Sequence, residues 1–304
     1  MRLSVIIPTY EREAILQRSL EALVKALEGI DAEVLVVNDS ANRLRGLQAN
    51  EKISIIQNRG KGAATARNFG ASLAKGSLLL FLDDDIIVQP RSIYRLFELH
   101  AAHPRSAFNF FWYFPEDLTR ELPRTSFGRY LLHYKINSQV SRLIDKDVVG
   151  KELVSDYGVS SYFFSIERDL FLETGGYDES IPHAGVEDII LSKKLRRLGI
   201  PMFLSVKDVV YHNESDRLDL WQVMERYRRA SVTMNAAVRS GHGEFERKFS
   251  VFKKLGYSVF LPFRKPVYRL SRLVPNLPVL DPLYFKWVNL LLGLSSYQGY
   301  RESK

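Results

Sequence analysis

The 304-residue sequence contains no cysteine. Disulfide frameworks, Cys-ligated zinc, iron–sulfur clusters and cysteine nucleophiles are therefore excluded. The absence of cysteine favours a reducing compartment. The first strand-like run begins at Leu3, which leaves no room for a secretory signal peptide. These absences predict a cytoplasmic protein.

Several nucleotide-binding and hydrolase motifs are also missing. The sequence has no GxxxxGK[ST] loop, no GxGxxG after a strand, no GxSxG and no HExxH. Segment 252–273 is interrupted by Lys and Arg and segment 283–294 is short, so neither reaches the roughly 18 uninterrupted apolar residues of a membrane-spanning helix. P-loop enzymes, Rossmann dehydrogenases, serine hydrolases and zinc metalloproteases are therefore set aside.

The net charge of the chain is concentrated in its C-terminal tail. Of the formal +8, residues 240–304 supply eleven Lys or Arg against four Asp or Glu, a net of +7, which leaves about +1 for the rest. Aromatic and leucine residues interleave with these cations. One interpretation is a basic amphipathic surface that lies against anionic lipid. The other is a helix packed on the protein's own body, with a solvated basic rim. The residues concerned include Phe252, Phe260, Phe263, Tyr268, Leu270 and Leu273.

The N-terminal body alternates strand-like and helix-like patterns. Short β-branched or leucine-rich runs predict buried parallel strands, and the stretches between them have apolar residues at helical spacing. This alternation predicts an α/β fold, a mostly parallel twisted sheet with flanking helices, in which ligands bind at the carboxyl ends of the strands. The predicted strands are 2–10, 32–39, 53–58 and 77–85, and the predicted helices are 11–29, 62–76 and 89–100.

Three consecutive carboxylates, Asp83, Asp84 and Asp85, follow one of these apolar runs. Like charges this close repel, so cations or hydrogen bonds must compensate, and Mg²⁺ or Mn²⁺ takes carboxylate oxygens readily. In an extended strand Asp83 and Asp85 would point to the same side and share one ligand. The alternative is a solvated acidic turn, or acids placed before the helix at 89–100.

Seven short blocks follow one another along residues 4–212. They are SVIIPTYER (4–12), VVNDS (36–40), NRGKGAATARNFG (58–70), LLFLDDD (79–85), ETGGYDE (173–179), GVEDIILSKKLRRLG (185–199) and VVYH (209–212). Each block alone is a weak signal, but in this order and spacing they resemble the family-2 inverting glycosyltransferases of GT-A fold. The resemblance covers about residues 3–215. The last part of the chain lies outside it.

The resemblance implies a nucleotide-sugar donor site at the ends of the first strands. It implies Asp39 as the acceptor of a hydrogen bond from the nucleobase, although Asn38 stands where an Asp is common, which leaves the choice of base less certain. The element containing Arg67 and Asn68 would lie under the nucleotide, where an Arg can contact a base carbonyl or the diphosphate. The implied donor-binding residues are Pro8, Tyr10, Glu11, Asp39, Arg67, Asn68, Asp83 and Asp84.

The resemblance also implies a metal site, for Mn²⁺ or Mg²⁺. Asp85 would hold the ion that bridges the diphosphate. His212 ends the last strand of the blocks and matches a histidine that completes the metal shell in some relatives. A lone histidine is as readily a surface or core residue, so both interpretations of His212 stay open.

A second acid pair, Glu187 and Asp188, opens a helix predicted to bury Leu191, Leu195 and Leu198. Acids are favoured at a helix N-terminus in any case. The resemblance implies Asp188 as the catalytic general base, and the chemistry needs one because a sugar hydroxyl is a poor nucleophile until its proton is removed. It places Gly176, Asp178 and Glu187 on the acceptor side, although a helix C-cap and turn explain the glycines equally well.

The predicted function is inverting, metal-dependent sugar transfer to an acceptor hydroxyl, in bacterial surface-glycan or glycolipid assembly. The implied partners are a nucleotide-sugar donor, with UDP the commonest base of the family, and a glycan or lipid-linked acceptor, and no nucleic acid. The location would be the cytoplasm, either free or peripheral on the cytoplasmic face of the membrane. The predicted domains are a GT-A catalytic domain at 1–215, with a nucleotide-sugar half at about 1–105 and an acceptor half at about 106–215, and a basic, aromatic-rich helical extension at 216–304.

Two other functions compete with this prediction. A sugar nucleotidyltransferase would use a similar sheet, but it would carry a Gly-rich basic loop after the first strand, where this chain has PTYERE. A nucleotide-sugar-binding module without activity would have lost its acids, whereas Asp85 and Asp188 are present. A nucleic-acid binder is disfavoured because the tail's cations are interleaved with leucines and no recognised nucleic-acid motif is present.

Overall fold

The computed structural model describes residues 2–139, 151–181 and 185–303. They form two compact units. The first contains residues 2–115, 151–179 and 187–213, and the second contains 116–139, 180–181, 185–186 and 214–303. The second unit therefore includes the predicted extension and also a segment from the middle of the chain.

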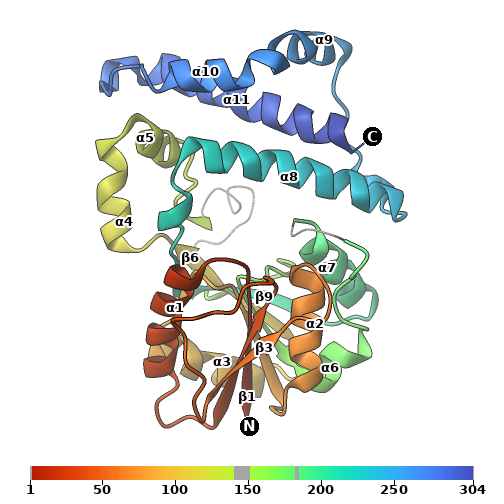
Figure 1. Ribbon diagram of the computed structural model, residues 1–304. Coiled ribbons are helices and arrows are strands. Elements are labelled where there is room, and N and C mark those ends of the chain that lie inside the picture. The colour runs from red at the N-terminus through yellow and green to blue at the C-terminus, as the bar shows by residue number, and fades with distance from the viewer. Residues whose placement is uncertain (1, 140–150, 182–184, 304) are drawn as a thin grey trace. The chain divides into compact units, whose positions relative to one another are not determined.

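A mixed β-sheet with helices on both faces forms the first unit (Figure 1). In the described part of the chain its strand order is β3-β2-β1-β4-β8-β6-β9-β5, with β7 paired to β9. The strands are β1 (Leu3–Thr9), β2 (Ala32–Asn38), β3 (Ile53–Gln57), β4 (Leu78–Leu82), β5 (Ile86–Ile87), β6 (Ala107–Tyr113), β7 (Leu153–Ser155), β8 (Phe163–Glu167) and β9 (Met202–His212). The predicted α/β fold with flanking helices is confirmed.

The N-terminal half of the sheet is parallel, as its leucine- and valine-rich strands predict. β1 pairs in parallel with β2 and with β4, and β2 pairs in parallel with β3. The carboxyl ends of β1, β2 and β4 therefore meet at one edge, where Thr9, Asn38 and Leu82 are the last strand residues. The C-terminal half adds antiparallel pairs, because β8 runs against both β4 and β6.

Helices cover the two faces of this sheet (Figure 1). One core joins the sheet to α2, α6 and α7, whose inward residues Ala66, Phe171 and Leu191 are buried together with Phe81 of β4. The other face is covered by α1 and α3 (Figure 1). The helices of this unit are α1 (Glu13–Ala26), α2 (Ala63–Leu73), α3 (Pro90–Ala102), α6 (Arg168–Glu173) and α7 (Glu187–Arg197).

The predicted inward face of α7 is right at two positions and wrong at the third. Leu191 and Leu195 are buried, whereas Leu198 is exposed. The helix ends at Arg197, and the left-handed Gly199 then turns the chain toward β9. Leu198 therefore leaves the helical repeat before it can reach the core.

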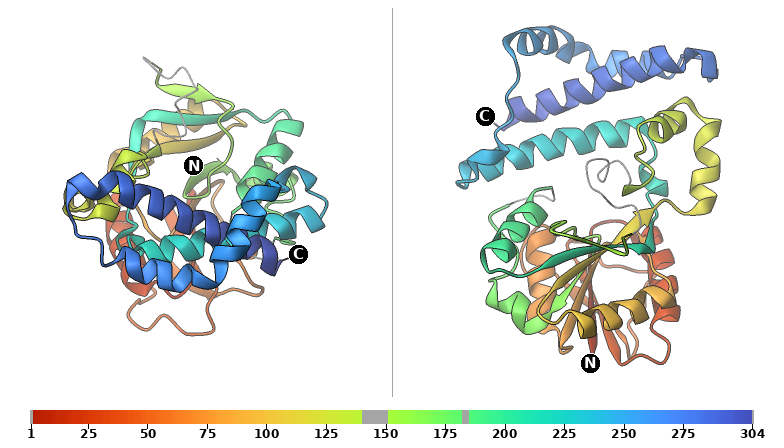
Figure 2. Two further views of the ribbon diagram at one scale, coloured as in Figure 1. Left: turned by 90° about the horizontal axis from the view of Figure 1, so that it is seen from above. Right: turned by 180° about the vertical axis from the view of Figure 1, so that it is seen from behind.

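The second unit is helical in its described residues. Its helices are α4 (Glu116–Glu121), α5 (Ser126–His133), α8 (Leu220–Arg239), α9 (Val251–Phe260), α10 (Arg264–Ser271) and α11 (Asp281–Glu302), with short 3-10 turns η1 (Leu122–Arg124), η3 (Ser215–Arg217), η4 (Gly243–Phe245), η5 (Leu261–Phe263) and η6 (Pro278–Leu280). The long helices α8 and α11 lie side by side (Figures 1 and 2). None of the described helices is both long and apolar enough to cross a bilayer.

The packing of α11 on α8 depends on a glycine. A Cβ built on Gly299 would lie 2.0 Å from the backbone oxygen of Arg228, so only glycine permits this approach. Asn235 of α8 donates to the carbonyl of Tyr300 at 3.0 Å, and Val288 and Leu291 of α11 are buried. The self-packing interpretation of the tail therefore holds for α11. It holds only in part for α9 and α10, which contact α11 but leave many apolar side chains exposed.

Candidate active site

The three consecutive aspartates lie in a turn at the carboxyl edge of the sheet. β4 ends at Leu82, and the backbone N–H of Ile86 donates to the carbonyl of Asp83 at 3.2 Å. The expectation of an extended strand with Asp83 and Asp85 on one side is therefore wrong. A reverse turn follows the strand because the short strand β5 must begin at Ile86 and pair with β9.

Each of the three carboxylates accepts a hydrogen bond from an arginine. Asp83 accepts from Arg67 at 2.7 Å. Asp84 accepts from the hydroxyl of Thr9 at 2.8 Å and also from Arg12. Asp85 accepts from the same Arg12 at 2.9 Å. Arginines from two other elements therefore compensate the repulsion that the sequence predicts.

Burial affects the protonation of this cluster. Asp84 is buried, and loss of hydration together with the neighbouring Asp85 raises the pKa of its carboxyl to about 7. The guanidinium of Arg12 and the hydroxyl of Thr9 act in the opposite direction. An added positive charge would therefore stabilise the ionised form of this cluster.

His212 lies beside Asp85, where the sequence resemblance expects it. The antiparallel register of β5 and β9 pairs Ile86 with His212, which brings Nε2 of His212 to 3.1 Å from Oδ1 of Asp85. The ring of Trp112 packs edge-on against the imidazole at 5.0 Å. A buried carboxylate oxygen and an imidazole nitrogen this close are a donor pair that suits Mn²⁺.

Asp39 closes the edge beyond β2. Its backbone N–H donates to the carbonyl of Thr9 at 2.9 Å. Its carboxylate accepts from Asn58 at 2.6 Å and from the N–H of Gly62, just before α2, at 2.9 Å. Asn38, which stands where an Asp is common in the family, donates from its side-chain amide to the carbonyl of Asn42 at 2.7 Å. An Asp could not make this hydrogen bond when ionised.

The first block continues the same edge. Pro8 is half-buried near the end of β1, and Tyr10 and Glu11 are exposed beyond it. Glu11 has a positive φ of 54°, which is uncommon for a residue with a side chain and is frequent at functional turns. Its carboxylate accepts from Ser40 at 3.4 Å.

The second acid pair begins α7, as predicted. Asp188 is half-buried and accepts from the backbone N–H of Ser161 at 3.0 Å and from the hydroxyl of Ser161. Loss of hydration and the adjacent Glu187 raise the pKa of the Asp188 carboxyl to about 7, against the effects of Arg67 and Ser161. A carboxyl with this pKa is half-ionised near neutral pH, which suits a proton acceptor.

Arg67 connects the two acid clusters. From α2 its guanidinium donates to Asp83 at 2.7 Å and to Glu187 at 3.2 Å. Burial alone would lower the pKa of Arg67, but the nearby acids and Tyr177 raise it above its ordinary value. Two acids from distant parts of the chain, Asp83 and Glu187, thereby contact one buried guanidinium.

Asn68 forms hydrogen bonds with the loop that contains Gly175 and Gly176. The Asn68 amide donates to the carbonyl of Tyr177 at 2.9 Å and to Glu179 at 2.8 Å, and it accepts from the N–H of Tyr177. Gly176 is left-handed, and a Cβ there would meet Asn68 Oδ1 at 2.5 Å. These contacts support the turn explanation of Gly176. Asp178 is half-buried in this loop, and the donor role of Asn68 stays a prediction.

Sequence reasoning missed four residues of this site: Thr9, Arg12, Ser161 and Tyr177. Arg12 stands inside the first block and was open to detection, because three adjacent carboxylates call for a basic partner. Ser161 lies in a segment without a motif. Its hydroxyl hydrogen-bonds to that of Tyr177 at 2.9 Å as well as to Asp188, so only the fold reveals its place.

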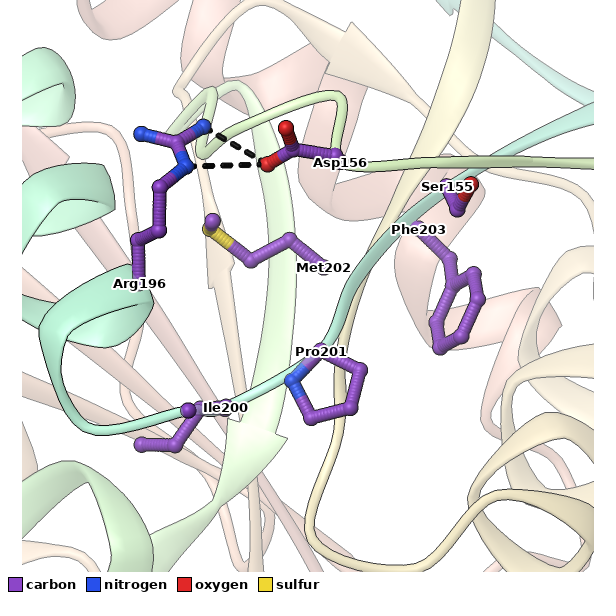
Figure 3. Close-up of a pocket in the computed structure, with 8 residues that line it drawn as sticks. Ser155, Asp156, Arg196, Ile200, Pro201, Met202 and Phe203 are labelled. Atoms are coloured by element: carbon purple, nitrogen blue, oxygen red, sulfur yellow. Dashed lines mark hydrogen bonds and ion pairs between the residues drawn. The ribbon is translucent and has the colours of Figure 1, made fainter.

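A separate pocket of about 280 Å³ lies at the other end of β9 (Figure 3). It is lined by Met202, Phe203 and the Arg196–Asp156 ion pair, whose atoms approach to 2.7 Å. Phe203 precedes His212 by nine residues, or roughly 30 Å of strand. The pocket is therefore distinct from the carboxylate cluster.

Comparison with known proteins gives one family and one fold. The family model described as glycosyl transferase family 2 matches residues 4–171, a range that includes the aspartate turn and ends before Asp188 and His212. Validoxylamine A glucosyltransferase from Streptomyces hygroscopicus subsp. jinggangensis (strain 5008) is 28% identical over 229 residues, which cover 67% of this chain and 53% of that protein. The chain spans about half the length of the curated relatives it matches most strongly.

Two solved structures share the fold. The crystal structure of GalNAc-T7 with UDP, GalNAc and Mn²⁺ aligns with a TM-score of 0.53 and 19% identity, over 70% of this chain and 43% of that one. The mannosyltransferase PcManGT from Pyrobaculum calidifontis, in complex with GDP-Man and Mn²⁺, aligns with a TM-score of 0.53 and 14% identity, over 99% of this chain and 86% of that one.

Proposed function

Because this chain belongs to glycosyl transferase family 2, we propose that it transfers a sugar from a nucleotide-diphosphate donor to an acceptor hydroxyl, with inversion and with the help of a divalent metal ion. The observation that carries the proposal is the bridge made by Arg67 between Asp83 and Glu187. It joins the carboxylates at the end of β4 to those at the start of α7. Groups suited to the leaving diphosphate and to the attacking hydroxyl thus belong to one site.

The donor nucleotide would bind along the carboxyl edge of the first strands. Asp39 is half-buried at that edge and would accept from a base N–H, with Pro8, Tyr10 and Glu11 beside it. Asp83 and Asp84 would lie at the ribose. Arg67, with Asn68 next to it on α2, carries a fixed positive charge suited to a base carbonyl or a phosphate.

The metal ion would be held by Asp85 and His212, which lie 3.1 Å apart. When bound, Mn²⁺ or Mg²⁺ supplies positive charge to the departing diphosphate. The fit rests on a buried carboxylate with an imidazole, a donor set typical of Mn²⁺ more than of Mg²⁺.

Asp188 would accept the proton of the acceptor hydroxyl. Its pKa of about 7 keeps a large fraction ionised at neutral pH while leaving it basic enough to take a proton. Ser161 fixes the carboxylate through two hydrogen bonds. Glu187, Gly176 and Asp178 would line the acceptor side. A direct attack assisted by one base gives inversion at the sugar carbon.

We also propose the wider setting that the sequence indicates. The donor would be a UDP-sugar and the acceptor a glycan or a lipid-linked sugar, in surface-glycan or glycolipid assembly. PcManGT is described with GDP-Man and GalNAc-T7 with UDP, so both bases belong in any test.

The test is a donor screen with the full chain. Purified protein is mixed with UDP-, GDP- and dTDP-sugars and Mn²⁺, with and without simple glycoside acceptors, and release of nucleoside diphosphate is measured. One donor should be hydrolysed slowly and consumed faster with an acceptor. Asp188→Asn should remove this turnover, and the exposed Asp169→Asn on α6 is the matched control.

Three other outcomes would contradict the proposal. Donor binding without any release of diphosphate would favour the inactive binding module. Release of pyrophosphate from a nucleoside triphosphate and a sugar phosphate would favour a nucleotidyltransferase. Retention of configuration in the product would exclude a single displacement.

A further inference from the structure

The apolar residues of α9 gather on one exposed face. Val251, Leu255 and Val259 follow one another at intervals of four residues, so they share a side of the helix, and Phe252 adjoins them. The side chains are strongly exposed, with Val251 at 78%, Phe252 at 88% and Leu255 at 66%. A helix that turned this face into its own protein would have buried it.

The other side of α9 faces α11. The hydroxyl of Ser258 lies 2.9 Å from that of Tyr297, and the ring of Tyr257 lies 5.7 Å from the ring of Tyr297. Tyr297 is buried in the helical unit. Tyr257 therefore anchors the helix on α11, with Ser258 at the border of the apolar face, and Phe252, Leu255 and Val259 stay exposed.

α10 is anchored in the same manner and presents a basic outer face. Arg264 is buried, where it pairs with Glu225 at 2.8 Å and stands 4.9 Å over the ring of Trp221. The outward residues are exposed cations and leucines. They are Lys265, Arg269, Leu270, Arg272 and Leu273, the last of which is 75% exposed.

The charge of this segment is one-sided. Residues 250–286 contain seven Lys or Arg and one Asp, and that Asp281 pairs with Arg129 of α5 at 2.7 Å. Within the described ranges of the chain, no carboxylate forms an ion pair with five cations of α9, α10 and the residue that follows α10. These cations are the exposed Lys253, Lys265, Arg269 and Arg272 and the half-buried Lys254.

We propose that the α9–α10 surface docks on a membrane leaflet that contains anionic lipid. This surface is defined as the exposed apolar residues Val251, Phe252, Leu255, Val259, Phe260, Phe263, Leu270 and Leu273 with the five cations named above. Amphipathic helices of this kind lie in the interface plane, with aromatic and aliphatic groups in the headgroup boundary and cations among the lipid phosphates. The Phe and Leu side chains of this surface suit the headgroup boundary, and its Lys and Arg side chains suit the lipid phosphates.

This inference does not rest on sugar transfer. A nucleic acid would meet the cations with its phosphates but would leave the exposed aliphatic side chains in water, and a second copy of the same face would bring like charges together. The leaflet is the occupant that satisfies both the apolar groups and the cations. Vesicle binding needs no donor and no metal, so it succeeds or fails independently of the proposed reaction.

The test is flotation of the full chain with vesicles. Phosphatidylcholine vesicles are compared with vesicles of phosphatidylcholine and phosphatidylglycerol, at low and at high salt. The protein should float with the anionic vesicles at least about tenfold better than with the neutral ones, because each Lys or Arg near an anionic leaflet adds attraction. Added salt should reduce the bound fraction, since it screens that share.

Two pairs of variants separate the apolar and charged contributions. Phe252→Ser with Leu255→Ser removes apolar groups, and Tyr94→Ser with Val24→Ser is the matched control at exposed positions of the sheet unit. Lys265→Glu with Arg269→Glu reverses two charges, and Lys25→Glu with Lys75→Glu is the control with the same total charge. All these side chains are exposed, so circular dichroism and the unfolding temperature should match those of the unchanged protein.

The expected result is at least a tenfold loss of vesicle binding in each α9–α10 variant and none in either control. The proposal is overturned if the unchanged protein stays with the unbound fraction, if it binds both kinds of vesicle equally, or if controls and variants lose binding alike. It is equally overturned if the α9–α10 variants instead abolish binding to DNA, or convert a dimer to a monomer in light scattering while vesicle binding is unchanged.

Discussion

At the scale of single residues, the buried charge of Arg67 organises the candidate site. It contacts Asp83 at 2.7 Å and Glu187 at 3.2 Å, and its positive charge lowers the pKa of the neighbouring Asp188. Burial and Glu187 raise that pKa more strongly, so the pKa of the Asp188 carboxyl is about 7. A proton acceptor with this pKa has a measurable pH signature.

The first prediction concerns Asp188. The carboxylate is the active form, and it predominates above the pKa of about 7. Transfer should therefore fall by about tenfold for each pH unit below that value and level off above it. Asp188→Asn keeps the size and hydrogen bonds of the side chain but not its basicity, so transfer should fall by about two to four orders of magnitude and lose this acid limb.

Donor affinity separates this role from others. It should persist in Asp188→Asn when UDP binding is measured by calorimetry with Mn²⁺. If donor affinity fell in step with the rate, Asp188 would belong to the donor or metal site instead. The exposed Asp169→Asn should leave both the affinity and the pH profile unchanged.

The second prediction concerns the metal. Asp85→Ala removes the carboxylate beside His212 and should abolish Mn²⁺-dependent donor binding while leaving the fold intact, because Arg12 keeps Asp84 as its partner. Calorimetric titration of Mn²⁺ and donor into the variant measures this directly. Full activity of the variant in the presence of a chelator would disprove the metal role.

At the scale of elements, the sequence predicts the strands well and their turns poorly. Leucine and valine runs define β1 and β2 within one residue at each end, and the start of β4 within one residue, because fully buried parallel strands require continuous apolar sequence. The sequence predicts either an extended strand or an acidic turn at the three aspartates and cannot decide between them, since nothing local reveals that β5 pairs with β9. Long-range pairing decides that geometry, and it also places His212 beside Asp85.

The tail shows the same limit. Composition alone leaves membrane docking and self-packing open, and the structure shows which helices bury their apolar side chains. α11 buries Val288 and Leu291, whereas α9 exposes Phe252 and Leu255. Removing residues 250–304 would therefore also remove α11 and uncover α8, so truncation tests folding more than membrane binding.

The third prediction tests the contact between α8 and α11. Gly299→Ala places a methyl group 2.0 Å from the Arg228 carbonyl oxygen, so it should lower the free energy of unfolding by about 1–3 kcal/mol. Gly256→Ala in α9 meets nothing within 4 Å and should be neutral or stabilise by up to about 1 kcal/mol, from helix propensity alone. Urea denaturation of both variants provides the comparison. Equal effects would mean that Gly299 is not required by close packing.

At the scale of the whole molecule, the proposed donor site and the α9–α10 surface belong to different compact units. The residues proposed for the nucleotide lie at the edge of the sheet, and the helical unit has its own core of α8 and α11. Chains with two cores need not unfold in one step. A ligand that binds one unit should stabilise that unit by mass action, and should leave the stability of the other unit unchanged.

The last prediction uses this separation. Leu291→Ala removes a fully buried side chain of α11 and should destabilise the helical unit by about 2–5 kcal/mol, whereas Leu283→Ala, exposed on the same helix, should change little. Calorimetry of Leu291→Ala should then resolve two unfolding transitions. UDP with Mn²⁺ should raise only the upper one, since ligand at 100 times its Kd adds about 2.7 kcal/mol to the unit that binds it. If UDP and Mn²⁺ raised both transitions by the same amount, the donor site could not be confined to the sheet unit, and its assignment to Asp39, Asp83, Asp84 and Asp85 would have to be revised.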